Sequence, residues 1–144
     1  MRDRDPKVFP KNSPQVKAVS NGEIDIGWVN HYYLHKLRAA DPSVQAANYS
    51  FVTPSDPGNL MMLSGAGVVA YSDRQDAAQA FVEFLLSPDS QAYFAQETYE
   101  YPTTPGVPLH ADVPPLDDKI VRANQVHLTD LSGTIALLRE LGLQ

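Results

Sequence analysis

The chain contains no cysteine, and this absence excludes a whole group of sites. Disulfide bonds, thiolate metal centres and cysteine nucleophiles are ruled out, although the cellular compartment stays open. Positive charge is also scarce, since 11 lysine and arginine residues stand against 17 aspartate and glutamate residues, for a net charge of −6. Because nucleic-acid binding needs a basic patch, we expect no nucleic acid among the partners.

Long apolar runs are missing as well. No run approaches the roughly 18 residues of a transmembrane helix. The first seven residues, MRDRDPK, hold no apolar stretch and therefore predict no signal peptide. What remains is an ordinary globular composition, with 43% apolar residues in a chain of 144. This length predicts one domain with a modest core.

Start and stop signals predict several helices. Each expected helix has a capping residue or proline before it and a glycine, proline or turn after it. The first follows Ser13-Pro14 and ends before Gly22, the second runs from Asn30 to about Ala40, the third begins near Asp73, the fourth is capped by Ser87 and runs to about Thr98, and the last is capped by Thr129 or Asp130 and ends at Gly142.

Stretches of strand character lie between these helices, at residues 7–9, 23–29, 46–52 and 60–71. In the second of them Ile24, Ile26 and Trp28 alternate with other residues, which is typical of a strand. Gly65 and Gly67 interrupt the fourth, which is expected to be one bent strand or two short ones. The alternation of strands and helices predicts an α/β fold.

Two adjacent tyrosines, Tyr32 and Tyr33, lie where the strand at 23–29 ends and the next helix begins. Ligands of open α/β sheets bind at the carboxyl ends of strands, and a helix N-terminus attracts anions. A hard cation such as Fe(III) prefers oxygen ligands and displaces a phenol proton. Without further information a structural interpretation is the simpler one, with Tyr33 packed in the core and Tyr32 on the surface.

The histidines are weaker candidates. His31 and His35 have the i,i+4 spacing that places two metal ligands on one helix face, but no third ligand is near in sequence. We expect them to be solvent-exposed, and we expect His110 and His127 to be surface residues. The sequence contains no phosphate-binding loop and no nucleophile elbow, so no enzymatic activity is expected.

Seven short stretches stand in a fixed order along the chain: Val8–Ser13, Ala18–Asp25, Val29–Tyr33, Asp56–Gly58, Ser64–Val68, Ala80–Leu85 and Glu100–Pro102. Together they resemble the C-terminal half of bacterial ferric-ion-binding periplasmic proteins, the substrate-binding subunits of iron ABC importers. The ordered set covers nearly the whole chain.

The resemblance implies a truncated C-terminal portion of a periplasmic-binding-protein type II fold, with sheet and helices in three layers. It makes residues 1–60 and 114–144 similar to the family's second lobe and residues 61–113 similar to its first lobe. Family members are about twice as long, with two lobes and a hinge. Met1 is therefore expected to be an internal methionine of a longer protein or the edge of a truncated one, without the first-lobe ligands.

The resemblance also implies a site. Tyr32 and Tyr33 match the family's paired tyrosines, which bind ferric iron as phenolates. Asn30 and Asn12 match two asparagines that help to hold a synergistic anion, carbonate or phosphate. The alternative is that both asparagines are turn or helix-capping residues without a binding role.

The function implied is binding of Fe(III) with its anion and delivery to an ABC permease in the membrane, from a periplasmic or other extracytoplasmic location. Two alternatives stay open. One is a related solute-binding protein for another small ligand. The other is a truncated domain that binds no ligand and self-associates as a homo-oligomer, which uncovered apolar faces and strand edges would favour.

Overall fold

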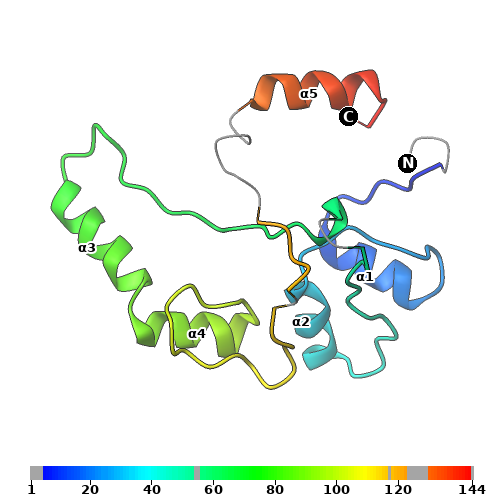
Figure 1. Cartoon of the computed structure of the whole chain (residues 1–144), viewed down its shortest axis with the longest axis horizontal. Coiled ribbons are helices and arrows are strands. Elements are labelled where there is room, and N and C mark those ends of the chain that lie inside the picture. Colours follow the sequence, from blue (N-terminus) through cyan, green and yellow to red (C-terminus); the bar gives the residue numbers. More distant parts are fainter. Residues whose placement is uncertain (1–4, 54–55, 117, 123–129, 144) are drawn as a thin grey trace. The chain divides into compact units, whose positions relative to one another are not determined.

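The computed structural model describes residues 5–53, 56–116, 118–122 and 130–143. Its elements are helices (Figure 1), and their bounds are α1 Asn12–Ser20, α2 Tyr32–Ala40, η2 Pro57–Asn59, α3 Gln75–Leu85, α4 Pro88–Thr98 and α5 Leu131–Glu140. No helix in these ranges is long and apolar enough to cross a membrane.

The chain divides into two compact units. Unit 1 consists of Met1–Lys11, Tyr49–Met61 and Asp117–Gln144, and unit 2 of Asn12–Asn48 and Met62–Leu116. Unit 2 therefore contains four of the helices, α1 to α4, together with all of the tyrosines and asparagines singled out above.

The core of unit 2 forms where α1 packs on α2. Val16 from α1, Leu34 from α2 and Val44 from the following segment are its buried members. Each buried side chain of this size contributes roughly 1.5–3 kcal/mol through the hydrophobic effect. Tyr33 is half-buried against this cluster, so the core holds one of the two adjacent tyrosines at the start of α2.

Local signals explain the helix ends in the rest of unit 2. Ser87 caps α4 by accepting a hydrogen bond from the Ser90 N–H, and Pro88 occupies the first turn, as the sequence predicted. The helix α3 has no buried residue, and both Phe81 and Phe84 lie 59% exposed on it. Its apolar stripe is therefore largely uncovered in the described structure.

In unit 1 the Asn59 side chain joins η2 to the segment that precedes it. Asn59 accepts a hydrogen bond from the Phe51 N–H at 2.7 Å and donates one to the Phe51 carbonyl at 2.8 Å. Asp56 caps η2 through the Gly58 N–H. Asp130 caps α5 by accepting from the Gly133 N–H, as predicted, and Gly142 after it has a φ of +67°.

The predicted strands are not present as strands in the described residues. The segments 7–9, 23–29, 46–52 and 61–71 are extended or irregular, and the single bridge within the described ranges joins Leu60 and Val121 in parallel. A strand needs a neighbour to take up its backbone N–H and C=O groups, and alternation in one segment does not supply that neighbour. Ile26 and Trp28 are accordingly exposed rather than buried on a sheet face.

Two further predictions concern the start of α1 and the segment that precedes α5. The helix expected to be capped by Ser13 already begins at Asn12, so Ser13 lies inside its first turn. The sequence of residues 117–126 is compatible with a short helix or an extended segment. This stretch falls partly outside the described residues, and its described part, 118–122, contains a turn and the bridge at Val121.

Candidate functional site

The start of α2 presents the tyrosine pair. The Tyr33 N–H donates to the Asn30 carbonyl and the Leu34 N–H donates to the His31 carbonyl, which closes the first turn. Leu34 is buried in the core, and its packing there fixes the orientation of this turn. Tyr32 and Tyr33 are therefore carried by backbone that is anchored on its inner side.

The two phenols lie together. Their ring centroids are 4.6 Å apart at an interplanar angle of 33°, and the two hydroxyl groups are within hydrogen-bonding reach of each other. The Asn30 side-chain amide donates to the Tyr32 hydroxyl oxygen at 3.1 Å, and the Asn12 side chain forms a hydrogen bond with the Tyr33 oxygen. The structure thus brings Asn12, Asn30, Tyr32 and Tyr33 to one point.

These contacts move the pKa values of the two phenols apart. The hydrogen bond from Asn12, then that from Tyr32, and then the charge of Lys36 hold the pKa of Tyr33 below its ordinary value. Asn30 acts in the same direction on Tyr32, but the hydrogen bond with Tyr33 and burial outweigh it, so the pKa of Tyr32 is raised. Tyr33 is therefore the phenol that loses its proton more easily.

Lys36 is a neighbour of the pair that the sequence reasoning did not single out. Its ammonium group lies 5.0 Å from the centroid of the Tyr32 ring, within the range of a cation–π contact. The sequence contained this information, because Lys36 follows Tyr32 by four residues and residues four apart share one face of a helix. A positive charge beside a phenol also favours the phenolate form.

His31 lies between the tyrosine pair and the segment that follows α4, with its ring edge-on to that of Tyr32 at a centroid distance of 5.7 Å. Its Nε2 atom lies 2.8 Å from the Tyr99 carbonyl oxygen, and its ring lies against that of Tyr101, with centroids 4.7 Å apart. Burial lowers the pKa of His31, although the Tyr99 carbonyl and Glu100 oppose this effect. The expectation that His31 is solvent-exposed is wrong, because these two contacts half-bury the ring.

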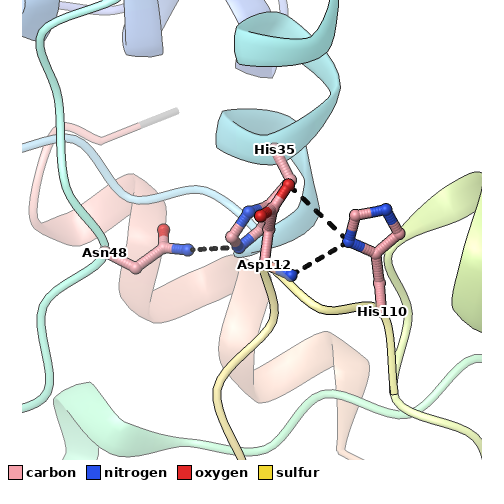
Figure 2. Close-up of polar contacts among 4 residues, drawn as sticks. All are labelled: His35, Asn48, His110 and Asp112. Carbon is pink, nitrogen blue, oxygen red and sulfur yellow. Dashed lines mark hydrogen bonds and ion pairs between the residues drawn. The ribbon is translucent and has the colours of Figure 1, made fainter. Parts of the chain in front are cut away.

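His35 is buried, with 8% of its surface exposed, so the same expectation is wrong for it too. Its ring stacks on Tyr99 at 5.6 Å, and its Nε2 atom accepts a hydrogen bond from the Asn48 side-chain amide at 3.3 Å (Figure 2). The same amide nitrogen lies 3.2 Å from the His31 carbonyl oxygen. Burial, followed by the charge on His31, lowers the pKa of His35.

His110 completes this cluster and is half-buried rather than a surface residue. It lies against Tyr99, with ring centroids 4.4 Å apart. Its Nδ1 atom accepts a hydrogen bond from the Asp112 N–H at 3.1 Å, which requires this nitrogen to be unprotonated. The Asp112 carboxylate lies 3.7 Å from the same nitrogen. His127, the remaining histidine, lies outside the described residues.

The imidazoles and carboxylates do not form a metal site of their own. Within the described ranges no group of three or more histidine, aspartate or glutamate side chains has the arrangement that a metal ion needs. A surface hollow of about 340 Å³ lined by His35, Arg38, Ala39 and Asp112 does not include the tyrosine pair.

Comparison with known families identifies the class of protein. The model of the bacterial extracellular solute-binding proteins matches residues 3–121, and the chain belongs to this family. The proteins of this family bind solutes.

Individual relatives narrow the resemblance. The chain is 38% identical over 143 residues to the major ferric iron-binding protein of Neisseria meningitidis, covering 96% of the chain and 42% of that relative. It is 37% identical over 107 residues to iron uptake protein A1 of Synechocystis (71% of the chain, 30% of the relative) and 31% identical over 141 residues to the Fe(3+)-binding periplasmic protein of Serratia marcescens (94% and 41%). These relatives confirm the resemblance drawn from the seven stretches, and the chain spans about two-fifths of the Neisseria and Serratia relatives and 30% of the Synechocystis one.

Proposed function

We propose that this chain binds ferric iron, as part of the substrate-binding protein of an ABC-type iron importer. Tyr32 and Tyr33 are the metal ligands, and both bind as phenolates. The observation that carries the proposal is the meeting of two phenol oxygens within hydrogen-bonding reach at the start of one helix. Iron-binding relatives support the choice of metal.

The chemistry of the pair suits this cation. A phenol has a pKa near 10 in water, so at neutral pH the metal must displace the proton. Fe(III) is a hard, highly charged ion that prefers oxygen ligands. The Asn12 hydrogen bond, the Tyr32 hydrogen bond and the Lys36 charge lower the pKa of Tyr33 and so favour its phenolate form before the metal arrives.

The anion is the second part of the proposal. Asn12 and Asn30 bring side-chain amides to the two phenol oxygens, and the first turn of α2 contributes backbone N–H groups and the positive end of the helix dipole. Such donors suit carbonate or phosphate seated beside the iron. We infer that the anion neutralises part of the metal charge and occupies coordination positions that the phenolates leave open.

The same proposal extends to the whole protein. Residues 1–60 and 114–144 belong with one lobe and 61–113 with the other, within a three-layer arrangement of sheet and helices. Two of the division points between the compact units, after Met61 and after Leu116, fall near these boundaries, while those after Lys11 and Asn48 do not correspond to them. Closure of the lobes on iron would precede delivery to the permease from the periplasmic side.

Titration with chelated Fe(III) in the presence of carbonate or phosphate tests the proposal. We expect a visible charge-transfer band from tyrosinate to iron. The variants Tyr32→Phe and Tyr33→Phe should each weaken the band and lower iron affinity at least tenfold, because each removes an anionic oxygen ligand. Tyr71→Phe is the matched control, since this tyrosine is 99% exposed, and it should behave like the parent.

Two outcomes would contradict the proposal. Absence of the band in the parent protein would show that this chain does not bind ferric iron. A band that survives both substitutions, or that weakens equally in Tyr71→Phe, would move the site away from the start of α2.

We also propose that the chain self-associates through the uncovered face of α3. Phe81 and Phe84 stack on each other there, with ring centroids 6.3 Å apart, and each is 59% exposed. Exposed aromatic pairs of this kind are unusual on monomer surfaces. Sedimentation velocity should detect dimers or larger species that Phe81→Ser with Phe84→Ser reduces, while Gln79→Ser, on the same helix, should not. A monomer at all concentrations would contradict this.

A further inference from the structure

The turn that ends α4 has an unusual backbone. Tyr99 adopts the left-handed conformation, with φ of 62° and ψ of 26°. Side chains other than glycine meet a steric cost in this region, so a tyrosine persists there only when its surroundings hold it. The Tyr99 N–H and the Glu100 N–H both donate to the Phe94 carbonyl, and this leaves the Tyr99 carbonyl directed outward.

The His31 side chain donates a hydrogen bond to the Tyr99 carbonyl. Because a carbonyl oxygen can only accept, the contact of 2.8 Å requires a proton on His31 Nε2. His31 is also the residue that caps the N-terminus of α2, yet its side chain makes no capping hydrogen bond. The imidazole thus forms a contact with a residue 68 positions away instead of closing its own helix.

The rings around this contact hold both partners. Tyr99 stacks on His35, one turn along α2, and lies against His110 on its other side. Tyr101 lies against the His31 ring. The segment that follows α4 therefore meets the first two turns of α2 through one hydrogen bond and two ring contacts, those of Tyr101 with His31 and of Tyr99 with His35.

We propose that His31 is a positioning residue for the tyrosine pair. Its bond to the Tyr99 carbonyl fixes the first turn of α2, which is the part of a helix that frays most readily. Tyr32 and Tyr33 follow His31 directly, so a small rotation of this turn separates their oxygens. The inference rests on the proposed function, because it concerns the geometry with which the same pair would bind a metal.

Two substitutions separate the hydrogen bond from packing. His31→Gln keeps an N–H donor at a similar reach, whereas His31→Leu keeps apolar volume and removes the donor. For Fe(III) with carbonate we expect His31→Leu to bind about tenfold more weakly than the parent, with a shifted charge-transfer band, as for groups that orient metal ligands. His31→Gln should stay within about threefold of the parent.

Tyr71→Phe is again the control, because this fully exposed ring takes no part in the contacts of His31 or Tyr99. It should keep the parent's band position. Equal losses in His31→Leu and His31→Gln, unchanged binding in His31→Leu, or the same band shift in Tyr71→Phe would each overturn the positioning role.

A measurement without metal keeps this inference apart from the proposed function. In the apo protein we expect the ¹⁵N shifts of His31 to report the Nε2–H tautomer, and magnetisation transfer to connect the Tyr32 and Tyr33 rings. That transfer should weaken in His31→Leu and return in His31→Gln. A Nδ1–H tautomer, or ring contacts that persist in His31→Leu, overturns the role of His31 even if iron binds, whereas a parent without a ferric band overturns the proposed function alone.

Discussion

At the scale of single residues, the phenol of Tyr33 owes its low pKa first to Asn12. Removing this donor in Asn12→Ala should raise the pKa of Tyr33 toward its ordinary value. Protons would then compete better with the metal, so the pH for half-loading with Fe(III) should rise. Phenolate absorbance during a pH titration measures the first effect directly.

Asn21→Ala is the control for this measurement, because Asn21 is exposed just after the other end of α1. Its titration should overlay that of the parent. An unchanged first phenol ionisation in Asn12→Ala would show that the Asn12 side chain does not act on Tyr33.

The residue scale is also where the sequence was most informative about the site. Tyr32, Tyr33 and Asn30 are neighbours along the chain, so their meeting follows from local geometry at a helix start. Asn12 joins them only because α1 packs on α2 through Val16 and Leu34. The contact of His31 with Tyr99 spans 68 residues, and no local pattern encodes it.

At the scale of elements, the short helix η2 depends on a glycine. A Cβ atom on Gly58 would lie 2.4 Å from the Phe51 ring. Gly58→Ala should therefore displace Phe51, weaken its two hydrogen bonds with Asn59 and lower the free energy of unfolding by about 1–3 kcal/mol, as measured by urea denaturation. Without the clash, alanine would stabilise the protein by restricting the unfolded chain.

Gly65→Ala provides the comparison, because a Cβ atom there would meet nothing within 4 Å. Its effect should stay within about 0.5 kcal/mol, or be slightly stabilising. Equal effects of the two substitutions would mean that the approach of Phe51 to η2 does not contribute to stability.

Helices and strands differ in how well they could be predicted. The ends of α4 and α5 follow from Ser87, Pro88, Asp130 and Gly142, each of which acts on backbone a few residues away. The strand-like alternation of Ile24, Ile26 and Trp28 specifies a face but no partner, and pairing is decided by segments far along the chain. Among the described residues this partner is missing, and the segment is merely extended.

At the scale of the molecule, the buried histidines make stability depend on pH. Burial lowers the pKa values of both His31 and His35, whereas in the unfolded chain they titrate near 6.5. As pH falls below about 6.5 the unfolded state takes up protons first, so the free energy of unfolding should decrease until the folded-state pKa values are reached. Above that range the two histidines contribute no pH dependence.

Urea midpoints at pH 7.5 and 5.5 test this, since the carboxylates remain ionised at both values. The groups that face His35 are His31, Arg38, His110 and Asp112, and only Asp112 favours its charged form. The difference between the two midpoints should shrink in His35→Gln, even if the variant is less stable throughout. A parent midpoint that rises on acidification would contradict the sign.

The extended stretch after η2 has a consequence for the lifetime of the chain. Residues 62–71 hold neither helix nor strand, and Met62, Leu63, Val69 and Tyr71 are more than half exposed. Proteases bind their substrates as extended, accessible chain, and they cleave exposed segments of this kind first. Residues 62–71 are therefore where digestion would begin, and a cut there would separate Tyr32 and Tyr33 from Tyr99, whose carbonyl His31 contacts.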